Sequence, residues 1–122
     1  MKLVVGVGCS LGCPPAELRA LVDAALATAP GDVAAIATAD RREGEPCVVE
    51  LAARRGVPLR THGAAALAAV VVPTPSEIVE RHVGTPSVAE AAALLTAGPG
   101  ARLLITKQRS AHATCAIAEV AG

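Results

Sequence analysis

The stretch that decides the fold reads Leu3-Val4-Val5-Gly6-Val7-Gly8-Cys9-Ser10-Leu11-Gly12-Cys13-Pro14-Pro15. Its apolar, β-branched start at residues 3–7 predicts a buried strand, and the glycines that follow break the strand pattern. The two prolines have the fixed φ that suits the first turn of a helix. Beyond them, apolar residues recur at helical spacing between positions 18 and 26. The stretch therefore predicts a strand, a glycine-rich loop and a helix in succession.

The glycines of this stretch have two interpretations. Gly6, Gly8 and Gly12 are spaced G-x-G-x-x-x-G, one residue longer than the dinucleotide-binding fingerprint, and the sequence contains no P-loop pattern. In the first interpretation the glycines only permit a tight turn. In the second, their N–H groups cradle a carboxylate or another anion, because the loop follows a strand and precedes the positive end of a helix.

The bulk composition limits the class of partner. At 122 residues the chain is expected to form one domain, residues 1–122, with a core of small aliphatic side chains because it has no aromatic residue. Its formal net charge is zero, which favours neither nucleic acid nor an anionic membrane as a partner, and bases would find no aromatic side chain to stack on. The longest apolar run, residues 64–72, is too short to span a bilayer. We therefore expect a cytoplasmic protein with reduced thiols.

Alternating apolar runs and helix signals predict an α/β fold. The architecture expected is three-layer α/β/α, with a mixed, mostly parallel sheet of about five strands and a C-terminal β-hairpin. Strands are predicted at residues 3–7, 33–37, 57–60, 103–105 and 113–119, with a turn at 107–110. Helices are predicted at residues 14–29, 46–55, 64–71, 74–82 and 87–97, and Gly56 and Gly98 are expected to end two of them.

Four short motifs then occur in order along the chain. They are Gly6-Val7-Gly8-Cys9, Thr38-Ala39-Asp40 with Glu45, Val83-Gly84 with the run at 88–94, and Lys107 with the run at 114–118. Each motif is weak alone, but their order and spacing resemble the CobE family, which is similar to the C-terminal domain of the CbiG proteins of cobalamin biosynthesis. The resemblance covers nearly the whole chain.

This resemblance implies a role in building the corrin ring. CbiG-type proteins are associated with opening the ring-A lactone of a cobalt-precorrin, with release of a two-carbon aldehyde, and CobE-type proteins are free-standing proteins of the aerobic route. Two classes of function follow. One is binding or handling of a tetrapyrrole (precorrin or corrinoid) intermediate, and the alternative is hydrolysis of the ring-A lactone. The partners implied are that intermediate and other enzymes of the pathway, and no cofactor of its own is expected.

The candidate site lies where loops follow the first strands and where the helix after Ser87 begins, because parallel strands send these loops to one edge of the sheet. Corrin precursors carry carboxylate arms, so N–H groups, hydroxyls and cations are the useful partners. The candidate ligand-binding residues are Gly6, Gly8, Cys9, Ser10, Gly12, Thr38, Asp40, Arg41, Arg42, Glu45, Gly84, Ser87 and Lys107. In a hydrolase, Asp40 or Glu45 would activate water.

Plainer interpretations of these residues stay open. Thr38, Ser87 and Glu45 are each candidates for helix caps, and Arg41 and Arg42 for a solvated loop. Arg42 stands where the family commonly has lysine, and arginine cannot act as a base at neutral pH.

The thiols and imidazoles predict no metal site. The spacing of Cys9 and Cys13 matches neither a zinc ribbon nor a thioredoxin motif, so buried or loop thiols are expected. The three histidines lie in separate segments, and no serine-hydrolase motif is present.

Overall fold

The computed structural model describes residues 1–70 and 87–122, and these form an α/β fold. In chain order the elements are β1 (Lys2–Cys9), α1 (Pro15–Leu26), β2 (Asp32–Ala39), the short 3-10 helix η1 (Asp40–Arg42), α2 (Pro46–Arg55), β3 (Leu59–His62), α3 (Ala64–Ala68), α5 (Val88–Ala97), β4 (Arg102–Arg109) and β5 (Ala113–Glu119). The helix predicted at residues 74–82 and the candidate residue Gly84 lie outside the described residues.

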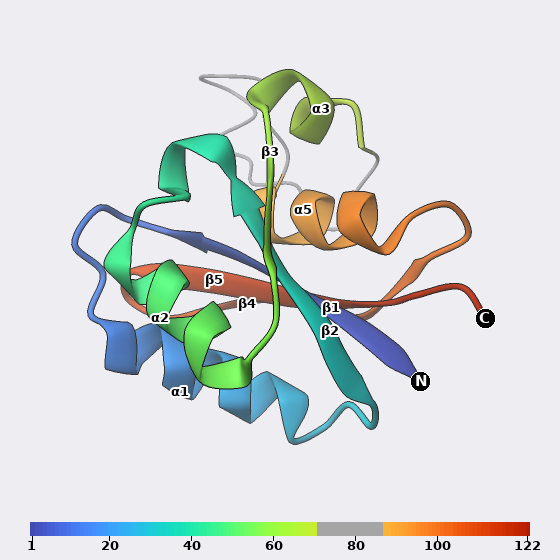
Figure 1. The fold of residues 1–122 in the computed structure, drawn as a ribbon, viewed down its shortest axis with the longest axis horizontal. Coiled ribbons are helices and arrows are strands. Elements are labelled where there is room, and N and C mark those ends of the chain that lie inside the picture. Colours follow the sequence, from blue (N-terminus) through green and yellow to red (C-terminus); the bar gives the residue numbers. More distant parts are fainter. Residues whose placement is uncertain (71–86) are drawn as a thin grey trace.

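In the described residues, one five-stranded sheet has the order β3-β2-β1-β5-β4. The pairs β1–β2 and β2–β3 are parallel, and the pairs β1–β5 and β5–β4 are antiparallel. Helices α1 and α2 cover one face of the sheet, and α3 and α5 cover the other (Figure 1). The predicted mixed α/β sheet with a C-terminal hairpin is therefore confirmed, with β5 alone running against the other strands.

The core has two apolar layers, one on each side of the sheet. On the side of α1 and α2, aliphatic side chains such as Val5, Leu18 and Ile36 are fully buried. On the other side, the layer consists largely of the alanines of α5. This helix lies very close to β1, because a methyl group added at Gly6 would be 1.9 Å from the carbonyl oxygen of Ala89. Small residues on both elements make this close approach possible.

Both glycines that were expected to end helices do so. Gly56 ends α2 in the left-handed conformation with φ of 65°, and Gly98 follows α5 with φ of 89°. The third strand begins two residues later than predicted, because the N–H of Val57 still donates to the carbonyl of Ala52 in α2. The last strand has the predicted bounds, but β4 extends to Arg109, so the hairpin turn lies closer to β5 than expected.

Glu17, in the first turn of α1, joins this helix to the turn between β4 and β5. Its Oε2 accepts hydrogen bonds from the Ser110 hydroxyl and from the His112 N–H (2.7 Å), and its Oε1 lies 2.8 Å from His112 Nδ1. The Ser110 hydrogen bond, together with those from His112, lowers the pKa of Glu17 to about 2. The start of α1 is thereby fixed against the hairpin turn.

This network predicts a pH-dependent contribution to stability. The pKa of Glu17 is about 2 in the folded chain against an ordinary value of 4.5, so between these values the unfolded chain binds more protons. The contribution is therefore complete above pH 4.5 and is lost as the pH falls towards 2. Urea unfolding of the wild type and Glu17→Gln should show a smaller difference in stability at pH 3 than at pH 6. An equal difference at both pH values would contradict this assignment.

Candidate functional site

The loops of interest meet at one edge of the sheet, opposite both chain termini (Figure 1). We call this edge the rim, and it comprises residues 8–13, 39–45, 87 and 107–113. Gly8 pairs with Thr114 of β5, and a methyl group added at Gly8 would lie 3.8 Å from Cβ of Val88, the first residue of α5. The prediction that the glycine loop lies beside the start of the helix after Ser87 is therefore confirmed.

Two hydrogen bonds join the loop after β1 to the loop after β2. The Arg42 Nε–H donates to the carbonyl of Cys9 at 2.8 Å, and the Gly12 N–H donates to Oε1 of Glu45 at 2.8 Å. Glu45 stands at the N-cap position of α2, but its side chain makes no capping hydrogen bond there. Its carboxylate instead accepts the hydrogen bond of the Gly12 N–H, in the loop after β1. The side chains of Arg42 and Glu45 thus hold the loop after β2 to the loop after β1, which lies 33 residues earlier in the sequence.

Several candidate residues have structural roles. Thr38 is fully buried, and its hydroxyl donates to the carbonyl of Val7 at 2.8 Å. At Gly6, the backbone of α5 fills the space that a side chain would need. Ser87 is the N-cap of α5, and its hydroxyl accepts a hydrogen bond from the N–H of Glu90. The capping interpretation of Ser87 is confirmed. Neither Thr38 nor Gly6 presents a group to a ligand at the surface.

The other candidates are more accessible. Arg41 is exposed, and within the described part of the chain no hydrogen bond or ion pair involves it. Ser10 is also exposed, and its N–H donates to the carbonyl of His112. Asp40, the first residue of η1, is exposed, and its Oδ2 lies 3.5 Å from the position of a methyl group added at Gly63. Lys107, near the end of β4, is half-buried.

Three thiols, those of Cys9, Cys13 and Cys47, lie together in the structure, although their spacing in the sequence did not predict this. Sγ of Cys47, in the first turn of α2, lies 3.6 Å from Sγ of Cys9, and Cys13 also contacts Cys47. Burial raises the pKa of all three thiols, so they are protonated at neutral pH. The one sequence signal for this meeting was Pro46, because a proline there starts a helix, and so places Cys47, at the edge of the sheet where Cys9 lies. Among the described residues, no group of histidine, cysteine, aspartate or glutamate side chains is arranged to hold a metal ion.

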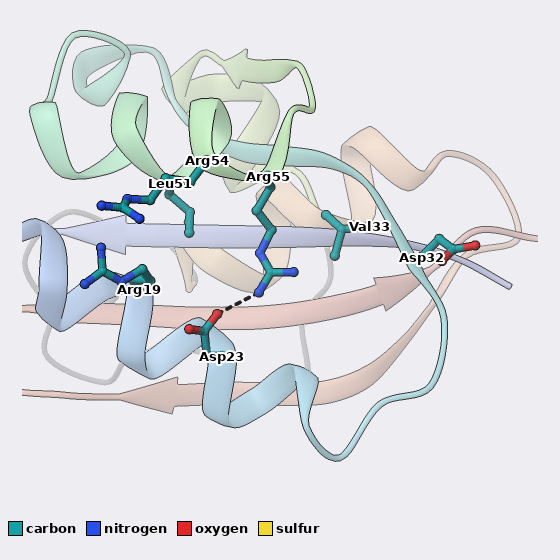
Figure 2. A pocket seen from close by; sticks show the side chains of 7 residues that line it. All are labelled: Arg19, Asp23, Asp32, Val33, Leu51, Arg54 and Arg55. Atoms are coloured by element: carbon teal, nitrogen blue, oxygen red, sulfur yellow. Dashed lines mark hydrogen bonds and ion pairs between the residues drawn. The ribbon is translucent and has the colours of Figure 1, made fainter.

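A separate pocket of about 380 Å³ lies between α1, α2 and the start of β2 (Figure 2). Arg55 crosses from α2 to Asp23 of α1 with a 2.6 Å contact, and Arg19 and Arg54 both contact Oε1 of Glu50. Each arginine of the pocket thus has a carboxylate partner. Its lining includes none of the predicted site residues, so this pocket and the predicted chemistry do not coincide.

The chain is similar along nearly its whole length to proteins of cobalamin biosynthesis. Residues 3–118 match the family model described as "Cobalamin synthesis G C-terminus". The chain is 43% identical over 121 residues to the protein CobE of Sinorhizobium sp, covering 95% of this chain and 79% of the relative. It is also 27% identical over 119 residues to a cobalt-precorrin-5A hydrolase of Priestia megaterium, covering 95% of this chain and 32% of that protein.

Two solved structures share the fold. One is CobE, a protein from the cobalamin biosynthetic pathway, with a TM-score of 0.85 and 34% identity, covering 96% of this chain and 89% of that one. The other is the cobalamin biosynthesis protein chiG from Agrobacterium tumefaciens, with a TM-score of 0.72 and 32% identity, covering 98% and 99%. Among the described residues, no helix is both long enough and apolar enough to cross a membrane.

Proposed function

The chain belongs to the cobalamin synthesis G C-terminus family and acts in cobalamin biosynthesis, and we propose that it binds an acidic tetrapyrrole intermediate at the rim. The intermediate is a precorrin or corrinoid, whose carboxylate arms meet N–H groups and cations of the loops after β1 and β2. Binding and presentation of the intermediate, rather than a chemical step, is the function that the geometry supports best.

One observation carries this proposal: the loop after β1 already binds a carboxylate. The Gly12 N–H donates to Oε1 of Glu45 at 2.8 Å, on an exposed part of the rim. A carboxylate arm of a ligand offers the same acceptor, and N–H groups of such loops bind anions because their dipoles are fixed by the backbone. The carboxylate of Glu45 then acts as an internal competitor for this position.

Cations of the rim supply the complementary charge. Arg41 is exposed, and the Arg42 Nε–H is held on the carbonyl of Cys9, which places its guanidinium group between the two loops. Lys107 reaches the same edge from the other side of β5. Guanidinium groups bind carboxylates with two parallel hydrogen bonds, so a ligand with several acidic arms gains from each cation.

Binding should be visible directly. We expect an acidic corrin precursor to bind with micromolar affinity or better, about −8 kcal/mol, and Arg42→Ala to weaken it about 5- to 150-fold, the equivalent of about 1–3 kcal/mol for a charged hydrogen bond. Titrations can be read from the visible absorbance of the corrin, where the polypeptide does not absorb, and the absence of Trp and Tyr leaves little protein background in the near ultraviolet as well. Raised salt should weaken binding, because exposed charges are screened over about 8–10 Å.

The matched control for this titration is Arg102→Ala. Arg102 is an exposed arginine at the other end of β4, where it pairs with Glu119. Its removal changes the net charge equally but leaves the rim intact, so affinity should change less than twofold. If no precursor binds at low salt, or if both arginine variants weaken binding equally, the proposed site is wrong.

Hydrolysis of a corrinoid lactone is a second candidate function, favoured by the similarity to the Priestia megaterium hydrolase. The chain spans about a third of that protein's length (32%). Asp40 and Glu45 are the rim carboxylates that would activate water. The two functions make different predictions for Glu45→Gln, and turnover of the lactone distinguishes them. If Glu45 competes with a ligand carboxylate, the variant binds at least as tightly as the wild type; if Glu45 is a general base, turnover of the lactone is lost while binding remains.

A further inference from the structure

The three thiols at the rim differ in how far reagents can reach them. Cys9, the last residue of β1, is partly exposed, whereas Cys47 is 1% exposed and Cys13 is 3% exposed. Cys47 Sγ lies 3.6 Å from Cys9 Sγ, and a disulfide needs about 2.0 Å between sulfurs. The two sulfurs are therefore in contact and need only approach further to form a disulfide. One accessible thiol thus stands in contact with one hidden thiol.

We propose that Cys9 and Cys47 form a dithiol site that closes to a disulfide on reaction with a small-molecule disulfide. This inference does not depend on the ligand bound at the rim, and it assigns a covalent modification that links the end of β1 to the first turn of α2. Cys13 and Cys115 are not the modified pair.

The reaction proceeds in two exchange steps. The Cys9 thiolate attacks one sulfur of the reagent, a mixed disulfide forms, and one reagent thiolate leaves. The Cys47 thiolate then attacks Sγ of Cys9, the protein disulfide forms, and the second reagent thiolate leaves. Two protein thiols are oxidised, one reagent disulfide is reduced to two thiols, and the two protein protons pass to the solvent or to the leaving thiolates. The second step is intramolecular, so the burial of Cys47 does not prevent it.

The surroundings of the thiols determine the rate. Burial raises the pKa of Cys9, and the nearby Glu45 carboxylate raises it further, although the neighbouring Cys47 thiol and the Arg42 guanidinium oppose these effects. Since the thiolate is the reacting form, the rate should rise about tenfold per pH unit below the pKa. The crosslink is therefore slow at neutral pH and faster in alkaline solution.

The disulfide would also act on the loop after β1. Residues 10–13 of this loop follow directly from Cys9, and the Gly12 N–H holds the carboxylate of Glu45, which stands two residues before Cys47. The crosslink ties together the same two segments that this hydrogen bond joins. It should raise the melting temperature, because it restricts the unfolded chain.

The test treats the reduced full chain with excess oxidised glutathione at pH 8.5 and follows it by mass spectrometry. We expect loss of two hydrogen atoms and, after trypsin, a crosslink between the peptides of residues 3–19 and 43–54, with Cys9 identified by fragmentation. Cys47→Ser and Cys9→Ser should each lower crosslinking at least tenfold, with Cys47→Ser trapping the mixed disulfide on Cys9. Cys13→Ser and Cys115→Ser should crosslink at the rate of the wild type.

Two results would overturn the proposal. The wild type could accumulate glutathionyl adducts without a crosslink, or the crosslink could join Cys13 rather than Cys9 to Cys47. The wild-type peptide map decides between these outcomes even if a serine variant does not fold. Dithiothreitol should restore the original mass and melting temperature.

Discussion

Gly6→Ala is expected to lower the free energy of unfolding by about 3 kcal/mol, at the upper end of the usual cost of overpacking. The added Cβ would lie 1.9 Å from the carbonyl oxygen of Ala89 and 2.8 Å from the backbone nitrogen of Ala93. Both atoms belong to the backbone of α5, so no side-chain rotation relieves the contact. The helix must move off the sheet, and its apolar layer opens. The melting temperature should fall by roughly 10 °C.

The matched control is Gly44→Ala, in the loop before α2. No atom of residues 1–70 or 87–122 lies within 4 Å of a methyl group at this position, and its φ is not in the left-handed region. Its effect should stay within about 0.5 kcal/mol, as for most surface substitutions. Guanidinium unfolding of both variants measures the difference. A Gly6→Ala variant as stable as the wild type would show that α5 does not lie so close to β1.

Gly6 also shows what the sequence could not resolve. The strand, loop and helix around it were predictable, because β-branched runs, glycines and prolines act over a few residues. The reason for a glycine at position 6 was not predictable. A tight turn, a bound anion and a closely packed helix each favour a residue without a side chain. The helix that occupies the space begins at Val88, more than eighty residues later. Only the packing of α5 against β1 shows which of these three reasons applies.

The same limit applies to the candidate site. Sequence reasoning placed the loops at one edge of the sheet, because parallel strands and the order of elements require it. It treated Glu45 as a cap or a base, but the carboxylate binds the Gly12 N–H instead. It expected reduced thiols and offered no way to tell which of them meet, although the sulfurs of Cys9 and Cys47 are in contact. Both pairings depend on side-chain positions between segments that are distant in sequence, and local patterns carry no information about them.

The second large effect concerns Glu90, a carboxyl group buried beneath the rim. Glu90 is 0% exposed in the first turn of α5, and its Oε2 accepts the N–H of Lys107 in β4 at 3.0 Å. Glu90→Ala removes this acceptor and leaves a cavity, and the N–H of Lys107 loses its partner in a place where water has little access. We expect a loss of about 3 kcal/mol in the free energy of unfolding, from the unpaired polar group and the lost packing together.

Glu90→Gln and Glu43→Ala separate the possible causes of that loss. Glu90→Gln keeps an oxygen acceptor of nearly the same shape, so it should cost only about 1 kcal/mol, while Glu43→Ala removes an exposed carboxyl group and should cost less than about 0.5 kcal/mol. The hydrogen bond also fixes the backbone at Lys107, so Glu90→Ala should weaken binding of an acidic corrin precursor at temperatures where it remains folded. If Glu90→Ala is as stable as Glu43→Ala, the carboxyl group does not hold α5 to β4, because a buried acceptor that anchors two elements cannot be removed without cost.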